Sequence, residues 1–194
     1  FSTASLAQEY RKYYRIFKNK KKLILDVNKL SKNKKYYDIS SINPSRNHKY
    51  LAYGEDKIGR REFNIVVKDI KKNKDIEKNL CSSTGTIIWN ASSNGYFYLK
   101  NNPITLITDS LYFHKLGTSS KNDKLIFKEK DKEYNLSISL SRTKNFLLLN
   151  ISKTECNEFW YLNLNEEIFN LKRFLKRKNK HLYYMDDTSE DFFI

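Results

Sequence analysis

Short apolar runs separated by polar turns return along the chain with a period of about 45–50 residues. Each copy has a first apolar run, a polar turn, and a second run that is more strongly apolar. The four copies pair residues 39–42 with 50–53, 86–89 with 96–99, 136–140 with 146–149, and 182–185 with 192–194. Short runs bounded by turn residues are typical of strands, so the pattern predicts four β-hairpins.

Further strand-like segments follow the hairpins, at residues 63–70, 111–116, 124–130 and 159–164. Propeller blades are built from three to four antiparallel strands in a period of this length. We therefore expect an all-β fold, a partial β-propeller of about three to four blades of antiparallel strands. An antiparallel sandwich also strings short strands between turns, but the four matched hairpins favour the propeller.

The hydrophobic pattern also predicts where each strand lies in its blade. The continuous apolar runs at 50–53, 96–99 and 146–149 predict inner strands that are buried on both faces. The alternation at 63–68 predicts a strand further out, with one wetter face.

The repeats divide the chain into a leading segment, 1–22, of unassigned structure and a partial propeller at 23–194. Helical patterns occur only at 1–14 and 166–178, and the second of these equally reads as a strand. The propeller repeats are expected near residues 39–70, 85–130, 134–164 and 180–194.

The net charge of +15 raises the question of a polyanionic partner. The 29 lysines far outnumber the 8 arginines and are scattered along the chain, whereas groove and phosphate readers favour the planar fork of arginine. An AT-rich genome, whose codons favour Lys, Asn and Ile, accounts for the excess, so we expect no nucleic-acid partner.

Two further compositional features concern location and redox chemistry. No run approaches 18 consecutive apolar residues, and residues 1–8 lack a signal-peptide pattern, so we expect a cytoplasmic protein without a membrane partner. Cys81 and Cys156 belong to no Cys-x-x-Cys pair. We therefore expect packing cysteines, with neither a zinc site nor a disulfide framework.

Several motifs occur in a fixed order along the chain. They are Leu25-Asp26-Val27-Asn28, Asp56-x-x-Gly59-x-x-Glu62-Phe63, Val67-Lys68-Asp69, Gly85-x-Ile87-x-Trp89, His114-Lys115-Leu116-Gly117-Thr118 and Phe127-x-Glu129-x-Asp131. In this order and spacing the chain resembles the amino-terminal propeller of the prolyl oligopeptidase family, most closely its oligopeptidase B (protease II) branch. The turn Asn43-Pro44-Ser45-Arg46 departs from the Ser-Pro-Asp usual in the family, and 103–109 lacks the expected Arg-Pro type of sequence.

The resemblance implies a parent serine peptidase whose propeller restricts entry of short peptides to an α/β-hydrolase domain, with cleavage after Lys or Arg. No Gly-x-Ser-x-Gly elbow occurs, since the five glycines are never so spaced. We therefore expect no catalytic, cofactor-binding or metal-binding residues, and no activity of this chain alone. The alternative function is a stand-alone propeller that binds a protein or peptide.

The expected partners follow from the same resemblance. They are the hydrolase domain of the parent enzyme and, when joined to it, short basic peptides. The chain ends within a fourth repeat, which predicts a propeller fragment that is marginally stable and self-associates through exposed blade edges.

Five residues invite a functional interpretation, and each has a simpler structural one. Glu62 is predicted to pair with a neighbouring Lys or Arg rather than to contact substrate. Trp89, flanked by isoleucines, is predicted to pack between blades rather than to stack on a ligand. His48, His114 and His181 lie in different repeats without a close acidic pattern, and are predicted to be turn or strand-face residues.

Overall fold

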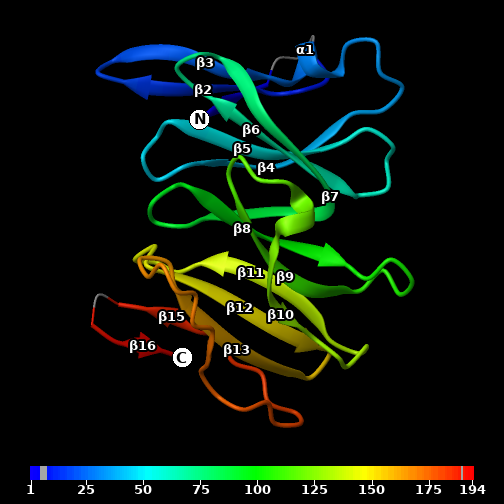
Figure 1. Ribbon diagram of the computed structural model, residues 1–194, viewed down its shortest axis with the longest axis vertical. Helices are drawn as coiled ribbons and strands as arrows, with labels where there is room; N and C mark the ends of the chain where they lie inside the picture. Colours follow the sequence, from blue (N-terminus) through cyan, green and yellow to red (C-terminus); the bar gives the residue numbers. More distant parts are fainter. Residues whose placement is uncertain (5–7, 189) are drawn as a thin grey trace.

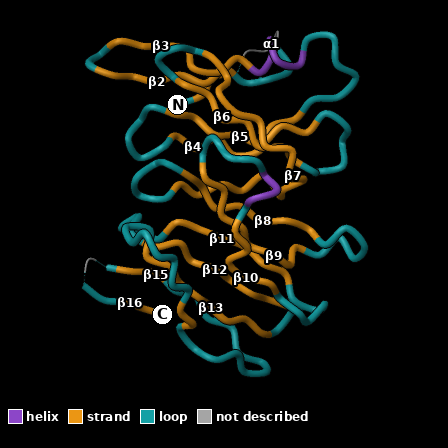
Figure 2. Tube along the Cα trace, viewed as in Figure 1, coloured by secondary structure: helices purple, strands orange, loops and turns teal. Residues whose placement is uncertain are grey.

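The computed structural model of the chain describes residues 1–4, 8–188 and 190–194, which are almost entirely β-structure (Figures 1 and 2). In chain order the elements are β1 (Ser2–Thr3), β2 (Lys12–Phe17), β3 (Lys20–Asp26), α1 (Val27–Ser31), β4 (Asp38–Pro44), β5 (Tyr50–Asp56), β6 (Phe63–Asp69), β7 (Lys74–Trp89), β8 (Gly95–Asn101), β9 (Thr108–Lys115), the short 3-10 turn Ser120–Asn122, β10 (Lys124–Lys128), β11 (Asn135–Leu140), β12 (Phe146–Lys153), β13 (Cys156–Asn163), β14 (Lys172–Arg173), β15 (Asp186–Asp187) and β16 (Phe192–Phe193). All strand pairs are antiparallel.

The strands form small sheets that follow one another along the long axis of the molecule (Figure 1). The first sheet has the order β1-β2-β3. A ladder from β4 to β10 comes next, then a sheet of order β11-β12-β13-β14, and finally the hairpin β15-β16. This succession of small antiparallel sheets confirms the all-β class and the partial β-propeller predicted from the repeats.

Strand β7 belongs to two sheets at once. Residues between Lys74 and Ser83 pair with β6, whereas Ser83 and Ile87–Trp89 pair with β8. Between these parts the chain bends at Ser82 and Gly85, whose φ angles are 48° and 85°. We call β4-β5-β6 with the first part of β7 the second sheet, the second part of β7 with β8-β9-β10 the third sheet, and β11 to β14 the fourth sheet.

Three clusters of buried side chains lie between successive sheets, and β8 shows how a single strand serves two of them. Tyr96 and Tyr98 join the cluster between the second and third sheets. Phe97 and Leu99 join the cluster between the third and fourth sheets. All four side chains are at most 2% exposed, which confirms the prediction that this apolar run is buried on both faces.

The other continuous runs behave in the same way. In β5, Leu51 and Tyr53 face the first sheet while Ala52 faces the third. In β12, Leu147 and Leu148 point into different clusters. Each run is the second strand of its sheet, flanked by a strand on either side, and the first apolar run of the repeat lies at the sheet edge.

The predicted difference between the two faces of β6 is present except at Val66. Phe63, Ile65 and Val67 are buried on one face, whereas Asn64 and Lys68 are half-buried on the other. Val66 shares the wetter face but is 2% exposed, because it packs toward the first sheet.

The turns that join the first two strands of the second, third and fourth sheets share one geometry. In the three copies the N–H of the opening residue donates to the carbonyl five residues later, at 2.9–3.1 Å: Ser45 to Tyr50, Asn90 to Gly95, and Ser141 to Phe146. The residue three positions after the opening one has a positive φ, between 57° and 65°: His48, Ser93 and Lys144. The repeat is therefore preserved in backbone conformation even where its turn residues differ.

Two expectations about local structure need correction. Residues 1–14 contain β1 and the start of β2, so this segment is not helical where the structure describes it. At 166–178 the strand alternative is the correct one, since this segment contains β14. The α-helix that is present, α1, lies after Asp26, whose side chain accepts a hydrogen bond from the N–H of Asn28. In the last repeat, Asp186–Asp187 rather than 182–185 pairs with Phe192–Phe193.

Among the described residues, no helix is long and apolar enough to span a bilayer.

Candidate functional site

The first strands of the second, third and fourth sheets lie side by side. Ser40 of β4 donates from Oγ to the carbonyl of Gly85 in β7, at 2.8 Å. Trp89 of β7 donates from Nε1 to the carbonyl of Asn43 in β4, at 2.9 Å. Strand β11 in turn contacts β7. Together these strands form the wall that faces a channel in a propeller.

A groove of about 220 Å³ opens in this wall. It is lined by residues of all three strands and of the adjoining turn: Ser41, Asn43, Pro44, Arg46, Thr86, Ile87, Ile88, Trp89, Ile138, Ser139 and Leu140. Leu140, 42% exposed, is the large apolar side chain most open to solvent among them. The lining is mixed, with apolar side chains beside five polar ones: Ser41, Asn43, Arg46, Thr86 and Ser139.

Arg46 supplies the charge at the edge of this groove. Its Nη1 lies 3.5 Å from Oδ1 of Asn165, a long hydrogen bond to the fourth sheet. None of the ion pairs among the described residues includes Arg46. Burial lowers the pKa of its guanidinium from the ordinary value. Arg46 is therefore a cation without a carboxylate neighbour on the channel side of the sheets.

Trp89 is a packing residue, as predicted. Its side chain is 4% exposed and stacks on Tyr50, with ring centroids 6.2 Å apart. It also meets Tyr96 edge-on at 5.7 Å. Because its indole N–H bonds Asn43 of the neighbouring sheet, Trp89 fixes the spacing of two channel-facing strands.

The loop between β5 and β6 is organised by one carboxylate. Asp56 accepts hydrogen bonds from the backbone N–H groups of Ile58, Gly59 and Arg61, at 2.8–3.0 Å. Gly59 has a φ of 76°, a conformation that glycine adopts without strain. Glu62 takes part in none of the ion pairs among the described residues, so the predicted pairing with Lys or Arg is wrong.

His114 lies in a buried network rather than alone on a strand face. Its Nδ1 is 2.6 Å from Oδ1 of Asp123, and its Nε2 is 2.9 Å from Oε1 of Glu77. The Asp123 contact is a hydrogen bond, whereas the Glu77 contact has ion-pair distance without hydrogen-bond alignment. Asp123 also accepts from the hydroxyl of Tyr98 at 2.5 Å.

This environment changes the titration of His114. Burial alone lowers the pKa of the imidazole. The carboxylates of Glu77 and Asp123 raise the pKa by a larger amount, so the net shift is upward. Because carboxylates occupy both ring nitrogens, the imidazole is suited to hold two sheets together rather than to accept a proton from a nucleophile. His114 is a strand-face residue of β9, as predicted, and its acidic partners come from β7 and from the turn before β10.

His48 and His181 are not part of this network. His48 is an exposed turn residue with a φ of 57°, as predicted. His181 forms an isolated β-bridge with Cys156 and packs on Tyr183, with ring centroids 5.4 Å apart. The three histidines therefore remain in separate places.

The cysteines contribute to packing between sheets. Cys81 and Cys156 are both buried and free. Each belongs to an apolar cluster between sheets, and burial raises the pKa of the Cys81 thiol to about 11. Among the described residues, no group of three or more His, Cys, Asp or Glu is placed to hold a metal ion. The absence of catalytic, cofactor-binding and metal-binding residues remains a prediction.

A second ionic contact between sheets centres on Arg177. Arg177 donates from Nη2 to Glu158 of β13 at 2.8 Å and to Glu129, which follows β10, at 2.6 Å. Its guanidinium carbon also lies 4.2 Å from the ring centroid of Tyr134. Burial lowers the pKa of Arg177, but the two carboxylates raise it more. No local sequence pattern links these residues, because they come from three different segments.

Comparison with known proteins gives a family match over the whole chain. Residues 1–194 match the family model described as "Prolyl oligopeptidase, N-terminal beta-propeller domain". Among curated relatives, "Dipeptidyl aminopeptidase BI" of Pseudoxanthomonas mexicana is 28% identical over 70% of this chain, and "Protease 2" of Moraxella lacunata is 24% identical over 89%. The chain spans only 19% and 25% of the length of these two relatives.

Solved structures give the same fold. The chain is similar to oligopeptidase B from Leishmania major, with a TM-score of 0.87, 21% identity, and coverage of 93% of this chain and 26% of that one. It is also similar to oligopeptidase B from Trypanosoma brucei, with a TM-score of 0.84, 16% identity, and coverage of 97% and 27%.

Proposed function

This chain belongs to the prolyl oligopeptidase family and matches its N-terminal β-propeller domain from residue 1 to residue 194, and on that premise we propose that it is the propeller portion of an oligopeptidase B-like serine peptidase. In this role it gates the access of short basic peptides to a hydrolase domain that carries the chemistry. The observation that carries the proposal is the match to oligopeptidase B over 93% of this chain but only 26% of that one.

The channel-facing strands support a role in selection by size. The first strands of three sheets are held at close spacing by the bonds from Ser40 to Gly85 and from Trp89 to Asn43. A wall tied in this way does not widen easily, because each bond links two different sheets. An extended peptide passes along such a wall, whereas a folded protein is excluded.

The net charge of the chain favours recognition of basic residues by the hydrolase domain rather than by the propeller. A net charge of +15 repels basic peptides at long range, so attraction of Lys or Arg side chains has to come from carboxylates outside this chain. We therefore assign exclusion by size to the propeller and recognition of the basic residue to the hydrolase domain.

A chimera tests this division of labour. The chain replaces the matched part of Leishmania major oligopeptidase B, and cleavage of a short fluorogenic Arg-Arg peptide is compared with cleavage of a long unfolded polypeptide. We expect the short peptide to be cleaved and the long one to resist. Equal cleavage of both substrates would contradict the proposed gating.

Two controls accompany the chimera. The double variant Ile138→Ala and Leu140→Ala removes apolar side chains that line the channel groove, and should raise the relative cleavage of the long substrate. The purified 194-residue chain alone should show no turnover of the Arg-Arg peptide. Turnover that a serine-directed inhibitor abolishes would refute the assignment of the chemistry to another domain.

A further inference from the structure

A second opening lies between the first and second sheets, and Pro44 lines both this opening and the channel groove. Two adjoining cavities of about 660 and 580 Å³ share Arg15, Phe17, His48 and Ile70, and so form one groove, which we call the hairpin groove. It runs between the β2-β3 hairpin and the turn that joins β4 to β5. In Figure 1 the hairpin projects at the left above that turn.

The floor of the hairpin groove is aliphatic and its outer wall carries exposed apolar side chains. Leu51 and Ile70 are buried at its base, with Ile24 and Ile42 beside them. Ile16 and Phe17 are 59% and 58% exposed. Apolar side chains that are gathered in a groove and rimmed by charge mark interaction sites more often than scattered ones do.

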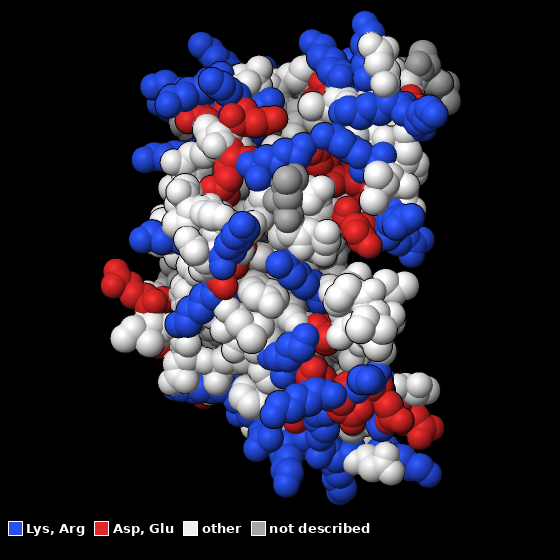
Figure 3. Space-filling model, turned by 45° about the vertical axis from the view of Figure 1, so that its right-hand side comes forward, with Lys and Arg blue, Asp and Glu red and all other residues white. Residues whose placement is uncertain are grey.

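The rim of the groove is basic. It carries six cationic residues and one carboxylate: Arg15, Lys18, Lys20, Lys22, Lys49 and Lys71, with Asp69. None of the six takes part in an ion pair among the described residues. Asp69 is bound within its own turn, where it accepts from the N–H of Lys72 at 2.8 Å. The rim charge is thus not neutralised within this chain. Figure 3 shows Lys and Arg at this end of the molecule and also, densely, at the opposite end.

We propose that the hairpin groove binds an acidic polypeptide segment that presents apolar side chains. The carboxylates of such a segment meet the six rim cations, and its apolar side chains enter between Phe17 and the aliphatic floor. A second copy of this chain is a poor occupant, because its charge of +15 repels the same rim. Phe1 stacks on Tyr14 at one end of the groove, with ring centroids 5.4 Å apart, so single-stranded nucleic acid is the competing occupant that the test has to distinguish. The proposal is independent of the peptidase role.

Fluorescence anisotropy on the 194-residue chain tests the proposal with labelled synthetic peptides. The first peptide alternates Glu and Leu, the second alternates Glu and Ser, and the third alternates Lys and Leu. We expect the Glu-Leu peptide to bind tightest, with affinity falling as salt rises. The double variant Lys20→Glu and Lys49→Glu should weaken it about tenfold, and Phe17→Ser should do the same.

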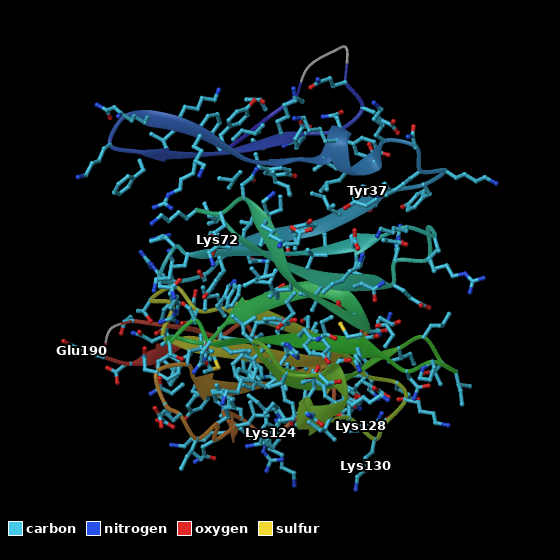
Figure 4. All side chains as sticks on the ribbon, turned by 45° about the horizontal axis from the view of Figure 1, so that its top comes forward. Tyr37, Lys72, Lys124, Lys128, Lys130 and Glu190 are labelled. Atoms are coloured by element: carbon cyan, nitrogen blue, oxygen red, sulfur yellow. The ribbon has the colours of Figure 1, made fainter. Side chains whose placement is uncertain are left out.

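Matched variants at other places serve as controls. Lys121→Glu with Lys130→Glu makes the same change in net charge on exposed lysines of the third-sheet region, and Lys130 points away from the body of the molecule in Figure 4. Phe193→Ser removes an exposed phenylalanine, 46% accessible, near the other end of the chain. Neither control should change the affinity, and thermal melts should show that all variants fold.

Several results would overturn the proposal. They are an absence of binding at about 50 mM salt, equal affinity for the Glu-Leu and Glu-Ser peptides, and equal weakening by the control variants. Tighter binding of a single-stranded oligonucleotide, weakened by the same groove variants, would instead make the groove a nucleic-acid site.

Discussion

Two interfaces differ in how completely side chains fill them. They are the interface between the third and fourth sheets and the interface between the first and second sheets. At the former, Phe97 is fully buried and packs on Phe113 and Phe169, with ring centroids 4.9 Å away in each case. At the latter, a cluster around Leu25 and Tyr37 fills one end, while the hairpin groove stays open at the other. Tyr37 lies between these two sheets in Figure 4.

The difference follows from how the sheets are tied. Strand β7 runs through both the second and third sheets, and Arg177 joins the carboxylates of the third and fourth. The first sheet is connected to the second along the chain through α1, and the filled end of their interface contains Val27 of that helix. The first sheet also has three strands where the next three have four. An apolar strand is thus buried along its whole length only where the neighbouring sheet is held against all of that strand.

Phenylalanine substitutions at the two interfaces should give the largest difference in the free energy of unfolding. Phe97→Ala empties a fully buried site and should lower the free energy of unfolding by about 3–5 kcal/mol. Phe17→Ala alters a side chain that is 58% exposed and should change it by less than about 0.5 kcal/mol. Urea denaturation of both variants measures the two values. Equal losses would mean that the first sheet is packed as tightly as the others.

The cross-sheet cations should show the next largest effect. Arg177→Gln leaves the nearly buried carboxylates of Glu129 and Glu158, whose side chains are 8% and 2% exposed, without their cation. We expect a loss of about 2–3 kcal/mol in the free energy of unfolding. Lys22→Gln removes the bond from Nζ to the carbonyl of Ile70 across the open interface, and should cost less than about 1 kcal/mol. Urea denaturation of both variants measures the two losses. A larger loss for Lys22→Gln would mean that the interface between the first and second sheets is the more tightly tied of the two.

Glycine substitutions test the joint between the second and third sheets. A Cβ on Gly85 would lie 2.4 Å from Cβ of Ser40, and the φ of Gly85 is already positive. Gly85→Ala should therefore cost about 2 kcal/mol. Gly117 has a φ of 78° but no atom within 4 Å of its added Cβ, so Gly117→Ala should cost about 1 kcal/mol, from backbone strain alone. Thermal unfolding ranks the two, and equal costs would show that the chain adjusts freely at the joint.

The smallest effect concerns pH. The folded pKa of His114 is raised above its ordinary value of about 6.5 by the carboxylates of Glu77 and Asp123, so protonation stabilises the folded chain. This contribution is complete below about pH 6.5 and is lost as the pH rises through the higher folded pKa. The free energy of unfolding of the natural chain should therefore fall across that window more than that of His114→Gln. Parallel curves for the two proteins would show that the network between the second and third sheets holds a neutral imidazole.

The strands that sequence analysis could predict are those whose burial depends on their own residues. The run at 96–99 predicted a strand buried on both faces, and the isoleucines that precede Trp89 predicted that its indole packs. Asp56 and Gly59 are residue types typical of turns, and the hydrogen bonds that form their turn are local.

The features that were missed depend on residues far apart in the chain. The continuity of β7 was hidden by Cys81-Ser82-Ser83-Thr84-Gly85, whose small polar residues read as a loop. Only pairing of this strand with β6 on one side and β8 on the other makes it visible. The network of His114 joins Glu77 and Asp123 from different segments, and the hairpin groove arises from the relative position of two sheets.

The 16-residue strand β7 also has a mechanical meaning. A pulling force applied to the chain cannot extract the second sheet without loading the third, because the same backbone carries the hydrogen bonds of both. Under tension the two sheets should rupture together and release the chain from Asp38 to Lys128 in one step. At roughly 3.5 Å per residue, that step lengthens the molecule by on the order of 300 Å before the folded dimensions are subtracted.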